Sequence, residues 1–92
     1  MHDALVGFLR QTGLDSKLAQ ARVFNAWRDA LGEAMARRAR AVRFQEGELL
    51  VEVQSAAHLH ELTNFTGDRY RVLANQKLGA ARITRVVFQL QR

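Results

Sequence analysis

The sequence contains no cysteine and no proline among its 92 residues. Without cysteine the chain can form no disulfide, no thiolate zinc site and no iron–sulfur cluster, and it has no thiol nucleophile. No apolar run approaches the roughly 20 residues that a membrane-spanning helix needs. The N-terminus also lacks the basic region and long apolar stretch of a signal peptide. We therefore expect a small soluble protein of a reducing, cytoplasmic compartment.

The composition is that of one ordinary globular domain. Hydrophobic residues make up 48% of the chain and charged residues 25%, which is typical of a folded domain. A chain of this length has room for a single hydrophobic core, and no repeat, low-complexity segment or linker divides it. The sequence predicts one domain over residues 1–92.

Positive charge is in excess and unevenly placed. The chain has 14 Lys and Arg against 9 Asp and Glu, a formal net charge of +5. The stretch between Glu33 and Glu46 contains four arginines and no acid, and the stretch after Asp68 contains five arginines, one lysine and no acid. Such charge attracts phosphate backbones or acidic protein surfaces, and charge alone favours neither of the two.

The first third of the chain has the apolar spacing of helices. A short helix is expected within residues 1–13, and a second helix begins at Asp15 or Ser16. Apolar residues then recur at steps of three or four and predict one buried stripe. The stripe consists of Leu14, Leu18, Ala21, Phe24, Trp27 and Leu31. Gly32 interrupts it.

The apolar period then changes to two, which is typical of strands. Val42 and Phe44 are expected to face the core from a first strand. Residues 45–48 make a tight turn whose glycine can adopt a positive φ, so an antiparallel second strand follows over residues 49–54. A last strand is expected over residues 83–90.

A long helix lies between the second and last strands. Ser55 is a suitable N-cap, and Leu78-Gly79 is a suitable end. Without a break this helix would be about 35 Å long at 1.5 Å per residue, which is long for so small a domain. A kink is therefore expected near residues 66–68.

These elements predict an α+β domain in the order α-α-β-β-α-β. Strand–helix–strand connections cross over with a right-handed sense, which makes the last strand parallel to the second. The result is a three-stranded mixed sheet with the second strand in the centre and the helices packed on one face. The expected sheet core is Val42, Phe44, Leu49, Val51, Val53, Val86, Phe88 and Leu90. The open face is expected to carry Arg43, Leu50, Glu52, Arg85 and Val87.

The sequence offers little for catalysis or metal binding. His58 and His60 with Glu61 look like a metal cluster, but helical residues two apart lie about 200° apart around the axis, so the histidines cannot chelate one ion. Ser16 and Ser55 are better explained as helix caps than as nucleophiles. The scattered glycines form no phosphate loop. We expect no enzyme activity, no metal, no cofactor and no small-molecule substrate.

Binding is the better-supported class of function. The candidate residues for contact with DNA phosphate or an acidic partner are Arg37, Arg38, Arg40, Arg43, Arg82 and Arg85. Two of them would lie beside Leu50 and Val87 on the open sheet face, and an apolar strip bordered by arginine is typical of protein-binding surfaces. A solvated helix end is the alternative interpretation of residues 37–43. Trp27 is expected to anchor the second helix in the core, with its indole N–H bonded to one acceptor.

Several short motifs occur in a fixed order along residues 23–88. They are Trp27 with Leu31-Gly32, the strand Gly47-Glu48-Leu49-Leu50-Val51-Glu52-Val53, the helix start Ser55-Ala56-Ala57, the pair Glu61-Leu62, and Asn75 before Leu78-Gly79 and the apolar strand Ile83 to Phe88. In this order and spacing they resemble the bacterial DciA-like domain over about three quarters of the chain. Each motif is weak alone, and together they are fairly specific.

The resemblance implies a KH-like fold and a nucleoid-associated, non-enzymatic adaptor that helps to load the replicative DNA helicase onto single-stranded DNA. It also implies structural roles for Trp27, Gly32, Gly47 and Leu62. His58 stands where the family often has an aromatic residue. The Gly-x-x-Gly loop of KH domains is missing, so clamping of a nucleic-acid backbone in the KH manner is not expected. A KH-like DNA- or RNA-binding module without a helicase partner is the alternative.

Overall fold

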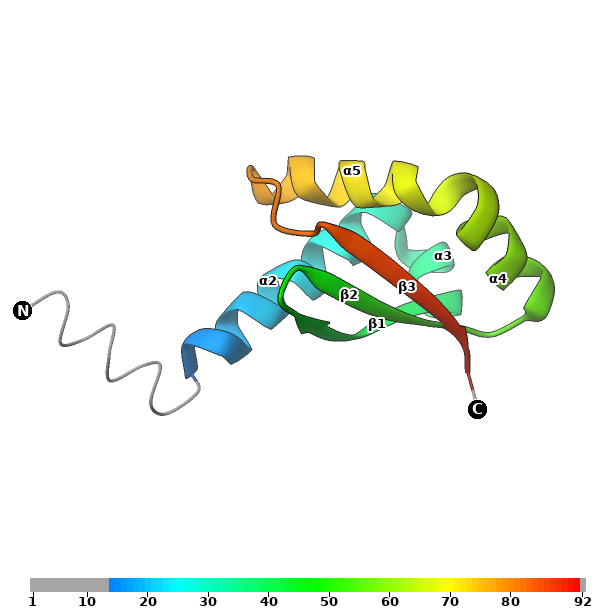
Figure 1. Cartoon of the computed structure of the whole chain (residues 1–92), viewed down its shortest axis with the longest axis horizontal. Helices are drawn as coiled ribbons and strands as arrows, with labels where there is room; N and C mark the ends of the chain where they lie inside the picture. Colours follow the sequence, from blue (N-terminus) through cyan, green and yellow to red (C-terminus); the bar gives the residue numbers. More distant parts are fainter. Residues whose placement is uncertain (1–13, 92) are drawn as a thin grey trace, which may run out of the picture.

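The computed structural model describes residues 14–91 (Figure 1). The short helix expected within residues 1–13 lies outside the described residues. In chain order the elements are α2 (Leu14–Leu31), α3 (Glu33–Arg38), β1 (Ala39–Gln45), β2 (Glu48–Val53), α4 (Ala56–Glu61), a π-helical turn (Leu62–Thr66), α5 (Gly67–Leu78) and β3 (Arg85–Leu90). This is the predicted α+β architecture, a KH-like α-α-β-β-α-β arrangement in which α4, the π turn and α5 make up the long helix.

The three strands form one mixed sheet in the order β1-β2-β3. β1 pairs antiparallel with β2 and β3 pairs parallel with β2, which confirms the predicted central strand and crossover. Figure 1 shows the helices behind the sheet and along its upper edge. The side chains of β2 that face them, Leu49, Val51 and Val53, are all fully buried. The helices cover one face of the sheet, and no helix in the described part of the chain covers the other.

A two-residue turn joins β1 to β2. Glu46 and Gly47 have φ values of +52° and +82°, and Gln45 pairs with Glu48 across them. Two consecutive positive φ values are typical of a type I′ turn, whose twist suits a hairpin. The carbonyl oxygen of Gly47 accepts a hydrogen bond from the N–H of Thr84 at 2.8 Å, so the turn is tied to the segment before β3. A Cβ at this position would lie 2.6 Å from the Thr84 Oγ1 atom, which explains the glycine.

A β-bulge in β1 changes the predicted core. Ala41 and Arg43 pair with consecutive residues of β2, so Val42 is an extra residue in the strand. Ala39 is fully buried, whereas Val42 is 39% exposed. The prediction that Val42 faces the core was wrong, because a bulge resets the alternation of inward and outward side chains. Phe44, beyond the bulge, packs against the core as predicted.

The third strand contributes less to the core than predicted. Val86 and Phe88 pack against it, but Leu90 is 46% exposed and the prediction for that residue was wrong. Leu90 is the last residue of an edge strand, where fewer neighbours can cover a side chain. Ile83, just before β3, is fully buried instead.

The buried face of α2 is offset from the predicted stripe. Val23, Ala26 and Trp27 are buried, while Leu18 is 61% exposed and Ala21 is also exposed. Figure 1 shows the reason: the first turns of α2 project beyond the sheet, and only its later turns lie behind it. None of the helices within residues 14–91 is long and apolar enough to cross a membrane.

The long helix is interrupted close to the predicted kink. The π-helical turn Leu62–Thr66 separates α4 from α5, and Figure 1 shows these two helices at a steep angle to each other. An extra residue in a helical turn is a known cause of such bends. The Ser55 hydroxyl caps the start of α4 by accepting from the N–H of His58 at 3.2 Å. Gly79 ends α5 in the left-handed conformation.

Gly67 lets the bend approach the sheet closely. It is the first residue of α5 and is buried. A Cβ at this position would collide with the carbonyl oxygen of Leu62 and would lie 2.6 Å from Cε2 of the Phe88 ring. The bend and β3 therefore pack against each other only because residue 67 has no side chain.

Candidate binding surfaces

The six arginines predicted to bind are all exposed, but they do not form one surface. Arg37 and Arg40 lie at a corner between α2, α3 and β1, Arg38 lies beside α4, Arg43 and Arg85 lie on the open sheet face, and Arg82 lies in the connection from α5 to β3. The structure therefore separates residues that the acid-free stretches of sequence group together.

The corner gathers three arginines around one depression. Arg28 from the last turn of α2, Arg37 from the last turn of α3 and Arg40 from β1 line a hollow of about 400 Å³, together with Glu33 and Ala36. Glu33 forms an ion pair with Arg37 at 3.1 Å, and both side chains are well exposed. No carboxylate within the described residues lies within 4 Å of the guanidinium groups of Arg28 or Arg40. This corner therefore carries a net positive charge.

A buried hydrogen bond holds the corner together. The indole N–H of Trp27 donates to the carbonyl oxygen of Ala39 at 3.1 Å. Because Arg28 follows Trp27 and Arg40 follows Ala39, this bond fixes two exposed arginines from different elements close to each other. Trp27 is itself 1% exposed, so it positions the corner without being part of its surface.

Arg28 is not among the six arginines that the sequence predicted to bind. It is followed by Asp29 and so lies outside the acid-free stretches that directed attention to the other arginines. Two signals in the sequence could have found it: its place at the C-terminal end of a helix, where positive charge is favoured, and its place next to the only tryptophan.

The corner continues into a second hollow whose lining residues are mostly apolar. Arg28, Ala36 and Arg40 also line an adjacent hollow of about 440 Å³. Its other lining residues are Phe24, Trp27, Ala39, Ala41 and Val42. We call the two hollows together the corner groove, and we use floor for its apolar lining residues and rim for its arginines and Glu33.

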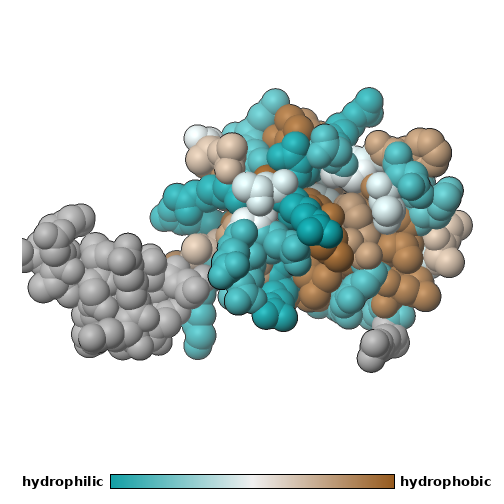
Figure 2. Space-filling view, in the orientation of Figure 1, coloured by the Kyte–Doolittle hydropathy of each residue, from teal (hydrophilic) through white to brown (hydrophobic). Residues whose placement is uncertain are grey.

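The open sheet face carries acidic as well as basic side chains beside an apolar strip. Leu50 and Val87 are neighbours in the register of β2 and β3, and Figure 2 shows an apolar strip crossing this face between hydrophilic side chains. The guanidinium group of Arg85 lies 3.8 Å from the carboxylate of Glu48. Positive and negative side chains alternate here, so the field of this face is weaker than that of the corner.

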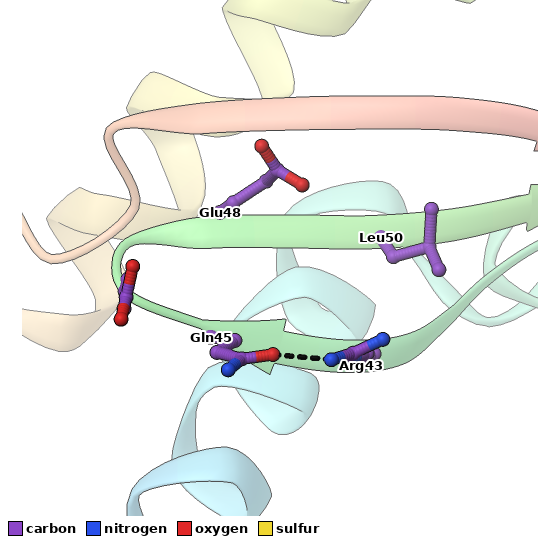
Figure 3. A pocket seen from close by; sticks show the side chains of 5 residues that line it. Arg43, Gln45, Glu48 and Leu50 are labelled. Atoms are coloured by element: carbon purple, nitrogen blue, oxygen red, sulfur yellow. Dashed lines mark hydrogen bonds between the residues drawn. The ribbon is translucent and has the colours of Figure 1, made fainter.

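A shallow pocket of about 390 Å³ lies at the turn end of the open face (Figure 3). Arg43 donates a hydrogen bond to the side-chain oxygen of Gln45 within it. Glu46 and Glu48 also line the pocket, and Leu50 lies at its far end. Because two carboxylates border it, the pocket is a poor site for phosphate and better suited to a polar protein surface.

The sequence profile of one protein family, described as "Dna[CI] antecedent, DciA", matches residues 1–88. The chain belongs to the DciA family. This family is associated with the loading pathway of the replicative DNA helicase and is non-enzymatic. No curated protein matches the chain.

A separate hollow contains His58, the residue at which the sequence departs from the DciA pattern. His58 is half-buried and lines a depression of about 570 Å³ between α3 and α4. Its other lining residues are Met35, Arg38, Gln54, Ser55, Ala57 and Glu61. Arg38 therefore lines a different hollow from Arg37, the residue before it in the sequence.

His58 and His60 of this DciA-family chain have separate surroundings. His60 is exposed, lies 3.0 Å from the side-chain nitrogen of Asn64, and faces the ring of Phe65 edge-on at 6.1 Å. Within residues 14–91, no group of three or more His, Asp or Glu side chains lies close enough to hold a metal ion.

Proposed function

We propose that this protein is an adaptor of the replicative DNA helicase that helps to place the helicase ring on single-stranded DNA in the bacterial cytoplasm, near the nucleoid. The family match over residues 1–88 is the observation that carries this proposal. The exposed arginines support it, because they offer contacts to DNA phosphate or to acidic residues of the helicase.

The mechanism follows from equilibrium binding. A partner can shift a helicase between two states only by the difference between its affinities for them. The adaptor would therefore bind a ring state that accepts single-stranded DNA more tightly than a state that does not. This role needs no catalytic group in the adaptor itself.

The corner is the better candidate for the helicase contact. One acid, Glu33, lines the hollow of its three arginines, and Arg40 forms no ion pair with Glu52, its partner in the register of β2, whereas Arg43 and Arg85 on the open sheet face have polar or acidic partners. Binding through the corner would leave the open face and Arg82 available to DNA. Both regions would bind negatively charged groups, which are carboxylates on the helicase or phosphates on DNA.

The test compares two charge reversals that change the net charge equally. Arg37→Glu with Arg40→Glu alters the corner, and Arg43→Glu with Arg85→Glu alters the open face. We expect the corner variant to lose helicase affinity by about tenfold or more, and the open-face variant to lose less. Wild-type protein that fails to bind the helicase under any condition would refute the proposed function.

Salt separates the proposal from the alternative, a KH-like nucleic-acid-binding module without a helicase partner. Binding to DNA or RNA phosphates weakens steeply as salt rises, while contacts between apolar surfaces do not weaken in this way. A module of the alternative kind would bind oligonucleotides with the steep dependence and would leave the helicase unbound at every salt concentration.

A further inference from the structure

We propose that the corner groove is the docking site for a short acidic segment of a partner protein, one that carries apolar side chains between its carboxylates. The inference deepens the proposed function and rests on it in one respect, because the helicase is the partner expected to present such a segment. The groove itself is argued from its floor, its rim and its place at the edge of the sheet.

The floor of the groove suits aliphatic side chains. The bulge in β1 leaves Val42 39% exposed at the edge of the sheet. Ala36, Ala41 and Phe24 line the same hollow and are half-buried. An exposed apolar surface of this kind, bordered by polar residues, is typical of a protein-binding site.

The rim of the groove suits carboxylates. Arg28 and Arg40 both line the shared hollow and have no ion-pair partner within residues 14–91, and Arg37 lines the adjoining hollow with them. Glu33, the acid that lines the rim, already pairs with Arg37. Planar guanidinium groups bind carboxylates in two-pronged geometry, so a segment with aspartates or glutamates matches this rim in charge and shape.

A protein segment fits the groove better than a nucleic acid does. Bases bind proteins by stacking on exposed aromatic rings or by hydrogen bonding at their edges. Trp27, which lines the groove, is 1% exposed and its N–H is already bonded to the Ala39 carbonyl oxygen. Apart from the half-buried ring of Phe24, the accessible floor at Val42, Ala36 and Ala41 offers aliphatic contacts, which favour apolar side chains of a peptide.

The first arm of the test uses a defined peptide and the full-length chain. The probe is a synthetic peptide with the sequence Glu-Leu-Asp-Glu-Leu-Leu-Asp, and its control replaces every acid with lysine. Titration into the isotope-labelled chain is followed by NMR. We expect the acidic peptide to shift the amide signals of Ala36, Ala41 and Val42, and the lysine peptide to shift none of them.

The second arm measures affinity for the helicase with matched variants. Val42→Glu places a carboxylate on the groove floor, and Val72→Glu is its control, because Val72 is 41% exposed on α5. Arg28→Glu with Arg40→Glu reverses the rim, and Arg69→Glu with Lys77→Glu makes the same charge change at exposed positions of α5. Circular dichroism checks each fold, and Val42→Ser replaces Val42→Glu if the latter unfolds.

The expected result is a loss of helicase affinity of about tenfold or more for each groove variant and of about twofold or less for each control. Equal effects of the groove variants and their controls would overturn the docking site, although helicase binding itself, and with it the proposed function, would stand. Loss of oligo(dT) binding by the groove variants, with unchanged helicase affinity, would overturn it in favour of nucleic acid. If the wild type binds no helicase, the proposed function fails and the peptide titration decides: shifts in the groove sustain the docking site, and their absence refutes it.

Discussion

Asn75 and Ile83 form a reciprocal pair of hydrogen bonds that fastens the start of the last strand to the long helix. The side-chain N–H of Asn75 donates to the carbonyl oxygen of Ile83 at 2.9 Å, and the N–H of Ile83 donates to the side-chain oxygen of Asn75, also at 2.9 Å. The carboxamide thus pairs with the backbone as a neighbouring strand would. Arg71, held by Asp68 at 2.7 Å, donates a second hydrogen bond to the same carbonyl at 3.2 Å.

Replacement of Asn75 by alanine is therefore expected to destabilise the fold. Two partly buried hydrogen bonds are lost, each worth about 1 kcal/mol, so the free energy of unfolding should fall by about 2 kcal/mol. Urea denaturation followed by circular dichroism measures the change. Gln76→Ala is the matched control, since Gln76 is the next residue of α5 and is exposed. Equal urea midpoints for the two variants would show that the pair does not contribute to stability.

Gly67→Ala should destabilise the protein, although the same change usually stabilises a helix. Gly67 has a helical φ of −58°, and alanine is favoured over glycine by about 1 kcal/mol at such positions. Here the new methyl group would meet the Leu62 carbonyl and the Phe88 ring. We expect a net loss of about 1–3 kcal/mol, the cost typical of overpacking.

A second variant separates the two contacts of residue 67. Phe88→Leu shortens the side chain that the new methyl group would meet, so Gly67→Ala should cost less in that background than in the wild type. A double-mutant cycle on the free energy of unfolding gives the difference. A Gly67→Ala protein that is more stable than the wild type would contradict the close packing of the bend on β3.

Trp27→Phe tests the bond that assembles the corner. Phenylalanine keeps an aromatic ring between Tyr70 and Phe88, which lie 6.2 Å and 5.9 Å from the indole ring. It cannot donate to the Ala39 carbonyl, which would be left buried without this partner. We expect thermal and urea unfolding to show a loss of about 1–3 kcal/mol. A change below about 0.5 kcal/mol would mean that the indole hydrogen bond is not needed to hold β1 on α2.

The regular parts of the fold could be predicted because they depend on local pattern. Alternation identified Leu49, Val51 and Val53 as the buried side of the central strand, and Gly47 identified the turn before it. The parallel last strand followed from the handedness of crossover connections. Each of these features can be predicted from the sequence of one element and a general rule on how consecutive elements connect.

Other features depend on contacts between distant residues and could not be predicted. The bulge at Val42 is a property of the register between two strands, and the exposure of Leu18 reflects how far α2 extends past the sheet. The corner groove is the clearest case, because Arg28 and Arg40 are brought together by the hydrogen bond between Trp27 and Ala39. The spacing of apolar residues in these two segments does not predict that hydrogen bond.

Salt dependence should distinguish the two kinds of contact that the protein is proposed to make. If three arginines contact single-stranded DNA phosphates, the logarithm of the affinity should fall with the logarithm of salt concentration with a slope of about −2. Helicase binding through the apolar floor and charged rim of the corner groove should fall less steeply. Fluorescence anisotropy with oligo(dT) and with labelled helicase between 50 and 200 mM salt, a range of about fourfold, compares them. Equal slopes would contradict an apolar contribution at the corner.

The loading reaction tests the central claim most directly. Replicative helicase from the source organism is mixed with circular single-stranded DNA, with and without the full-length protein, and the helicase bound to DNA is measured after separation from free helicase. We expect the wild-type protein to increase helicase loading, and the variant Arg28→Glu with Arg40→Glu to reduce this increase more than Arg69→Glu with Lys77→Glu does. No increase with the wild-type protein, together with intact oligo(dT) binding, would contradict the adaptor role and favour a nucleic-acid-binding module.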